Sequence, residues 1–199
     1  MNDLVIAFSA LEDMAIALGI AEKSVASVVR KFHAAWRNLV VLGFTSSGSI
    51  LADARRIVKD AVGDAYVEGL KEGGVAFEDM DSDDDLMIIE LTDQQTQYVT
   101  DFVKAVRAAR GDKAAQRAIL DRVELWTASI EAAGMQGLAS AKKNEMVTWH
   151  YGDTEHCNTC QHLDGQRHRR SWFSQRNYFP RKPGAAMDCG GYKCQCVLE

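Results

Sequence analysis

The cysteines of this chain are confined to its C-terminal end, and this constrains the fold of that end more than any other feature. All five lie between residues 157 and 196 of a 199-residue chain, and the first 156 residues contain none. Residues Met1 to Leu4 lack the basic start of a signal peptide, so we expect synthesis in a cytoplasm, where thiols stay reduced. An odd number of clustered cysteines in that setting favours a metal site over disulfides. The cysteines are Cys157, Cys160, Cys189, Cys194 and Cys196.

The spacing of these cysteines is typical of a structural zinc site. Cys157 and Cys160 are separated by two residues, so both thiolates can bind one ion from a tight turn. A second turn, made flexible by two glycines after Cys189, brings in the remaining ligands. We predict one zinc ion held by Cys157, Cys160, Cys189 and one of Cys194 or Cys196, with the fifth cysteine a free thiol. The reserve ligands are His150, His156 and His162.

The rest of the chain predicts a mainly α fold. The only two prolines of the whole chain, Pro180 and Pro183, lie in its cysteine-rich end. Glycine is therefore the only strong helix breaker in the first 145 residues. Apolar residues recur there at helical spacing, which indicates packing faces. We expect a multi-helix body in residues 1–144 and a small zinc-binding module of short strands and turns in residues 145–199. The predicted helices cover about residues 3–18, 22–42 (ended by Gly43), 49–71 (capped by residues 45–48), 92–110 (capped by Thr92) and 112–143 (capped by Asp112).

An acidic break is predicted near residues 75–91. Five acidic residues there match positions 1, 3, 5, 7 and 12 of a calcium-binding loop, but Asp84 stands where the sharp turn of such a loop needs glycine. We therefore interpret the run as a solvated acidic linker. The five acidic residues are Asp79, Asp81, Asp83, Asp85 and Glu90.

The C-terminal module also carries a basic segment with aromatic residues between the charges. Such a segment can hold a phosphate backbone or dock on an acidic protein surface, and both readings stay open. The net charge of −5 argues against a general nucleic-acid coat. No apolar run is long enough to span a bilayer. The segment contains Arg167, His168, Arg169, Arg170, Trp172, Phe173, Arg176, Tyr178, Phe179, Arg181 and Lys182.

The sequence shows no nucleophile elbow, Walker loop or dinucleotide-binding glycine motif. Asp153 and Glu155 are carboxylates near the cysteines, but a His-x-Glu signature of the deaminase kind is missing. A structural ion is therefore favoured over a catalytic one, and we do not expect an enzyme.

Short stretches of the helical body and a longer part of the cysteine-rich end form a further pattern: Ala54 to Val58, Ala65-Tyr66-x-x-Gly69, Arg122 to Trp126, Gly137, Trp149-x-x-Gly152-Asp-Thr-Glu-His-Cys157-x-x-Cys160-x-x-Leu163-Asp-Gly165, and Pro180 to Cys196. In these stretches the chain resembles the tailed-phage minor head proteins, also called head morphogenesis proteins, which include the Mu F-like proteins. Many members of that family end in His-Pro-x-Cys-Arg-Cys, so the second half of the ligand set is where this chain departs from them.

The resemblance implies a structural minor capsid component of the virion head, made in the host bacterial cytoplasm and assembled at or near the portal. Its implied partners are the portal and the major capsid or scaffold proteins, with no membrane. The alternative is a zinc-ribbon-like nucleic-acid-binding module that contacts packaged DNA.

Overall fold

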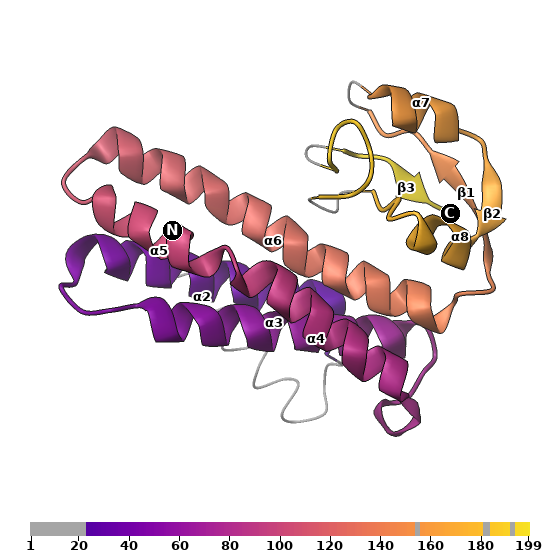
Figure 1. Ribbon diagram of the computed structural model, residues 1–199, viewed down its shortest axis with the longest axis horizontal. Coiled ribbons are helices and arrows are strands. Elements are labelled where there is room, and N and C mark those ends of the chain that lie inside the picture. Colours follow the sequence, from indigo (N-terminus) through magenta and orange to yellow (C-terminus); the bar gives the residue numbers. More distant parts are fainter. Residues whose placement is uncertain (1–22, 154–155, 181–183, 192–193) are drawn as a thin grey trace.

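The computed structural model describes residues 23–153, 156–180, 184–191 and 194–199 (Figure 1). The prediction of a mainly α fold with a small cysteine-bearing module is confirmed. The predicted first helix, about residues 3–18, lies outside the described residues. Among the described residues, no helix is both long and apolar enough to cross a membrane.

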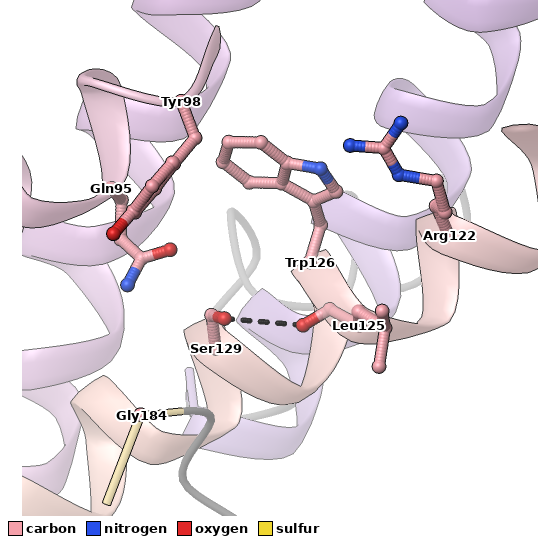
Figure 2. Close-up of a pocket in the computed structure, with 7 residues that line it drawn as sticks. All are labelled: Gln95, Tyr98, Arg122, Leu125, Trp126, Ser129 and Gly184. Carbon is pink, nitrogen blue, oxygen red and sulfur yellow. Dashed lines mark hydrogen bonds between the residues drawn. The ribbon is translucent and has the colours of Figure 1, made fainter. Parts of the chain in front are cut away.

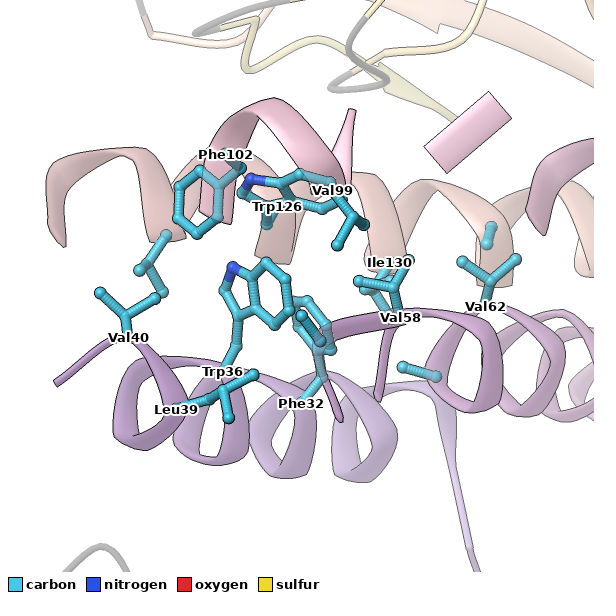
Figure 3. Packing of buried hydrophobic residues seen from close by; sticks show 14 of the residues in the cluster. Phe32, Trp36, Leu39, Val40, Val58, Val62, Val99, Phe102, Trp126 and Ile130 are labelled. Carbon is cyan, nitrogen blue, oxygen red and sulfur yellow. The ribbon is translucent and has the colours of Figure 1, made fainter. Parts of the chain in front are cut away.

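Three long helices form the body of the protein. They are α2 (Val25–Thr45), α3 (Leu51–Glu72) and α6 (Lys113–Ala141), and the shorter α5 (Val99–Ala108) packs against all three. Trp36 of α2 is fully buried at their centre, and its ring stacks on Phe32 and Phe102 and contacts Trp126 (Figure 3). The apolar stripes predicted from periodicity therefore meet in one core.

Helices α3 and α6 approach each other closely because glycines lie where they cross. A Cβ built at Gly69 would overlap with the backbone carbonyl of Gly134, and one at Gly137 would overlap with the carbonyl of Tyr66. The obstacles are backbone atoms, which cannot rotate out of the way as a side chain can. The crossing therefore requires the absence of side chains at Gly69 and Gly137.

The prediction of an acidic linker is wrong. A short 3₁₀ helix, η1 (Phe77–Asp79), is followed by the helix α4 (Ser82–Thr96), which begins inside the acidic run. The Asp81 side chain accepts hydrogen bonds from the N–H groups of Asp83 and Asp84 at 2.9 and 3.1 Å. Acidic side chains are favourable in a first helical turn because they face the positive end of the helix dipole. The run is therefore a helix start and does not form a calcium-binding loop.

Asp84 ties this helix start to the rest of the body. Its carboxylate is buried and accepts a hydrogen bond of 2.8 Å from the Tyr66 hydroxyl of α3 and one of 3.0 Å from the Ser140 hydroxyl of α6. Burial is the main cause that raises the pKa of Tyr66, and hydrogen bonding to Asp84 adds to it. One carboxylate thus joins three helices.

We expect Asp84→Ala to lower the free energy of unfolding by about 1–3 kcal/mol, because the buried Tyr66 hydroxyl would lose its acceptor. Asp83→Ala is the matched control, since Asp83 is an exposed first-turn acid of the same helix and should cost less than about 1 kcal/mol. Urea unfolding followed by circular dichroism measures both. Equal effects of the two substitutions would contradict the role of Asp84.

Three predicted helix boundaries also differ from the structure. Residues 45–48 do not cap the predicted helix 49–71, because α2 includes Thr45 and α3 begins after Ile50, whose side chain makes no cap hydrogen bond. The predicted helix 92–110 is divided between α4 and α5 by a break at residues 97–98, and Thr92 is a buried residue within α4 rather than a cap. Helix α2 continues past Gly43 to Thr45, and a Cβ at Gly43 would crowd Ile50 and Val106 at 2.7 Å. Gly43 therefore serves close packing rather than helix termination.

The C-terminal module begins with the strand β1 (Met146–His150), close to the boundary predicted near Asn144. This strand lies between β2 (Arg167–Arg169) and β3 (Val197–Leu198), antiparallel to both. Two short helices that were not predicted, α7 (Asn158–Leu163) and α8 (Arg170–Gln175), complete the module, and α8 packs on α6. The buried cluster of the module shares no residue with that of the body. The division into two domains at residue 144 stays a prediction.

Candidate metal centre

The five cysteine sulfur atoms converge in the module, in two groups that share Cys160. In each group the sulfurs lie within 4.8 Å of one another. Cys160 is buried and lies at the junction of the groups, 3.4 Å from the sulfur of Cys157. Thiolates this close repel one another unless a cation lies among them, and soft thiolates select ions such as zinc. The groups are Cys157, Cys160 and Cys189, and Cys160, Cys194 and Cys196.

The first cysteine pair is arranged by the start of α7. Cys157 is the residue that caps this helix, and its sulfur accepts a hydrogen bond of 3.4 Å from the N–H of Cys160. Burial raises the pKa of Cys157, but hydrogen bonds from the N–H groups and thiols of Cys160 and Cys189 outweigh burial and lower the pKa to about 7. Burial raises the pKa of Cys160, and its hydrogen bond with Cys157 adds to this. Metal-binding thiolates are commonly held in this way by backbone donors.

A tight turn brings Cys189 to this pair. Gly190 and Gly191 follow with φ of 59° and 74°, a left-handed conformation that glycine adopts without strain. The pKa of Cys189 is raised, mainly by burial. The Gly191 N–H donates a hydrogen bond to the Cys189 sulfur, which partly offsets this rise. The prediction of a second glycine turn near the cysteines is consistent with this geometry.

The last two cysteines reach the site through the sheet. Cys196 directly precedes β3, which pairs with β1 so that Trp149 lies opposite Leu198. A Cβ at Gly152 would overlap with the backbone of Gln195, so the chain after β1 runs directly against the segment between Cys194 and Cys196. Both thiols are buried, and both lie within 4.8 Å of Cys160.

Sequence reasoning missed a pair of residues that links the two cysteine turns. The Asp188 carboxylate accepts a hydrogen bond of 3.1 Å from the Thr159 N–H, and the Asp188 N–H donates one of 3.2 Å to the Thr159 hydroxyl. Thr159 lies between Cys157 and Cys160, and Asp188 directly precedes Cys189. This position next to the ligands was the signal available in the sequence.

The reserve histidines lie outside both sulfur groups. The Nδ1 atom of His156 lies 3.8 Å from the sulfur of Cys196, and the His156 ring stacks on Tyr151. His150 and His162 are exposed on β1 and α7. Among the described residues, the donors that form the two groups around Cys160 are therefore all cysteines.

The basic segment does not form a continuous aromatic platform. Phe173 and Phe179 are buried. Trp172 is half-buried between His168, whose ring lies 3.8 Å away, and Arg176, whose guanidinium lies 4.1 Å from the ring centre. Arg170 is held by Glu145 at 2.8 Å, and this hydrogen bond is the main cause that lowers the pKa of Glu145. Among the described residues of the segment, the exposed arginines that remain are Arg167, Arg169 and Arg176, and the predicted Arg181 and Lys182 lie outside the described residues.

A pocket of about 250 Å³ lies where the module meets the body (Figure 2). Tyr98 and Trp126 form part of its wall, with Arg122 on α6 and Gly184 from the module. None of its seven described lining residues is Asp, Glu, His or Cys, so the pocket is separate from the thiol cluster. The described lining offers no acid–base pair and no thiol nucleophile for chemistry.

We expect Cys194→Ser and Cys196→Ser each to keep one metal ion per chain, because the other thiol of the pair lies within 4.8 Å of Cys160. The double variant should fall to none, since only three cysteines would remain. Elemental analysis of the purified variants measures this. If only one of the two single variants loses the ion, Cys194 and Cys196 are not interchangeable, and the cysteine replaced in that variant is a required ligand.

The chain was compared with protein-family models, with curated proteins and with solved structures, and none of them matches it.

Proposed function

We propose that the C-terminal module binds one structural zinc ion through Cys157, Cys160, Cys189 and one of Cys194 and Cys196. The observation that carries this proposal is the convergence of five sulfur atoms around Cys160. Backbone N–H groups already point at two of these sulfurs, which stabilises thiolates. When bound, the ion would link α7, the glycine turn and the start of β3, and so supply folding energy to a module with a small core.

The role we propose for this ion is structural. Structural zinc sites are closed by protein ligands, whereas catalytic sites keep a position open to substrate. Cys160, Cys194 and Cys196 are buried in the module core, which favours a closed site.

We further propose that the protein is a minor head protein of a tailed bacteriophage, acting at or near the portal inside the head. The support is the resemblance of the cysteine segment and of the motif Arg122 to Trp126 to that family, together with a zinc module attached to a helical body. In this proposal the helical body packs on portal, capsid or scaffold subunits, and the module is a rigid docking element.

Binding to purified portal, capsid and scaffold subunits of the same phage tests this role. The metal-loaded full chain should co-sediment with one of them, and protein stripped of metal by a chelator should bind more weakly. A metal-loaded protein that binds none of these subunits would contradict the proposal. Because metal content is measured on the same sample, failure of the partner is distinguished from failure of the metal site.

A second candidate is a nucleic-acid contact, favoured by the exposed Arg167, Arg169 and Arg176. Phosphate contacts of this kind weaken steeply as salt rises. A salt-dependent shift of duplex DNA by the full chain, reduced in Arg167→Glu/Arg169→Glu, would favour this candidate. The absence of any shift at low salt would exclude it.

A further inference from the structure

The outer face of α4 carries exposed apolar side chains surrounded by acidic ones. Leu86 and Ile89 are 63 % and 57 % exposed, and their spacing of three residues places them side by side on the helix. Asp85 and Glu90 are exposed on the same face, and Asp93 lies one turn beyond Ile89. Large apolar residues grouped with charges of one sign are typical of an interaction surface. We call these five residues the acidic face.

The charge of this face is not neutralised within the molecule. Residues 72–103 contain ten acidic residues and no Lys or Arg. The ion pairs of the body lie elsewhere, as between Lys23 and Asp64. Among the described residues, no Lys, Arg or His forms an ion pair with an acid of α4. The surface therefore suits a partner that is basic and partly apolar.

The same chain presents a surface of that chemistry on its sheet. Along β1, Val147 and Trp149 point into the module core, so Met146, Thr148 and His150 lie on the outer face. In the register of the sheet, Arg169 lies opposite Met146 and Arg167 lies opposite Thr148. On its other side Thr148 pairs with the exposed Glu199, so this face carries two arginines and one carboxylate.

Both arginines of this surface are exposed, and Met146 is 47 % exposed. Neither arginine takes part in an ion pair among the described residues. We call Met146, Thr148, His150, Arg167 and Arg169 the basic face.

We propose that the acidic face of one copy binds the basic face of a second copy of this chain. The acidic face carries three carboxylates, whereas the basic face carries two arginines and one carboxylate, so the net charges are opposite. Both faces include exposed apolar side chains, so contact would bury Leu86, Ile89 and Met146 and pair the carboxylates with the arginines. A symmetric contact between two α4 helices would instead place acid against acid. Because two different faces meet, the contact can close as a two-fold dimer that uses both faces twice. If it does not close in this way, it repeats head-to-tail into a ring or a filament.

Sedimentation velocity of the full chain over a range of concentrations tests this proposal. We expect the unaltered protein to form oligomers at low salt and to shift toward monomer at high salt, because salt screens the paired charges. Leu86→Ser/Ile89→Ser should shift the protein toward monomer at low salt. Leu125→Ser, which changes an exposed leucine of α6 outside both faces, is the control and should leave association unchanged.

Charge reversal separates this contact from other modes of association. Asp85→Lys/Glu90→Lys and Arg167→Glu/Arg169→Glu should each be monomeric alone, because each sets like charges against each other. A mixture of the two variants should associate, since each restores a complementary face for the other. An unaltered protein that stays monomeric at low salt, variants that still associate alone, or a mixture that stays monomeric would each overturn the proposal.

Discussion

Replacing Gly137 by alanine is expected to lower the free energy of unfolding by at least about 3 kcal/mol, near the upper end of effects seen for a single methyl group. The added Cβ would overlap with the carbonyl oxygen of Tyr66 and would lie 2.9 Å from the carbonyl carbon and 3.0 Å from the Leu70 nitrogen. All three obstacles are backbone atoms of α3, so α3 and α6 must move apart. That movement would also loosen the hydrogen bonds that join Tyr66 and Ser140 to Asp84.

Gly63→Ala is the matched control for this substitution. Gly63 lies in the same pair of packed helices, but a Cβ there would meet only a side-chain carbon of Ile88, at the ordinary distance of 3.7 Å. Alanine is the better helix former, so Gly63→Ala should stabilise the protein by about 0.5–1 kcal/mol. Chemical unfolding of both variants gives the comparison. Equal and small effects would show that the helices cross less closely than described.

Cys160→Ser is expected to abolish metal binding and to unfold the module while the helical body remains folded. Cys160 is the one cysteine that belongs to both sulfur groups, and its side chain is buried in the module core, in the same cluster as Val147 and Trp149. No other described cysteine can replace it in both groups. Because metal binding would supply much of the folding energy of the module, loss of the ion and loss of structure should occur together.

Hydrogen exchange resolved by peptide measures this outcome together with metal content. Peptides from β1 and α7 should lose protection in Cys160→Ser, whereas those from α3 and α6 should keep it. The single variants at Cys194 and Cys196 serve as controls that remove a thiol without removing Cys160. A Cys160→Ser protein that retains one ion per chain would contradict the central position of this residue.

The helices that the sequence predicts well are those with a long apolar stripe and a local cap. Helix α6 begins where Asp112 predicts, because the Asp112 carboxylate accepts hydrogen bonds from Ala114 and Ala115 within its own first turn. The signal and the interaction that produces it lie within three residues, so no tertiary information is needed.

The helix that begins inside the acidic run could not be predicted from local signals alone, because residues distant in the sequence stabilise it. Asp81 supplies a local cap, but the burial of Asp84 is stabilised by Tyr66 and Ser140, which are 18 and 56 residues away. A run of aspartates without those partners has the composition of a solvated linker. The same limit applies to Gly43, whose role depends on contact with Val106.

The candidate site was more accessible to sequence reasoning than the surfaces around it. The spacing of Cys157, Cys160 and Cys189 predicted three thiols that the structure does bring together. The basic segment was harder, because charge and aromatic content do not say which side chains are buried. Phe173 lies in the module core, whereas Arg167 and Arg169, on either side of His168 in β2, are both exposed.

The measurement that tests the central claim most directly is the metal content of the purified full chain by elemental analysis, with thiols counted before and after chelation. A structural site predicts one zinc per chain and one reactive thiol, rising to five reactive thiols when the ion is removed. A protein without metal whose cysteines are paired in disulfides would contradict the account, because the sulfurs around Cys160 would then be brought together by covalent bonds rather than by an ion.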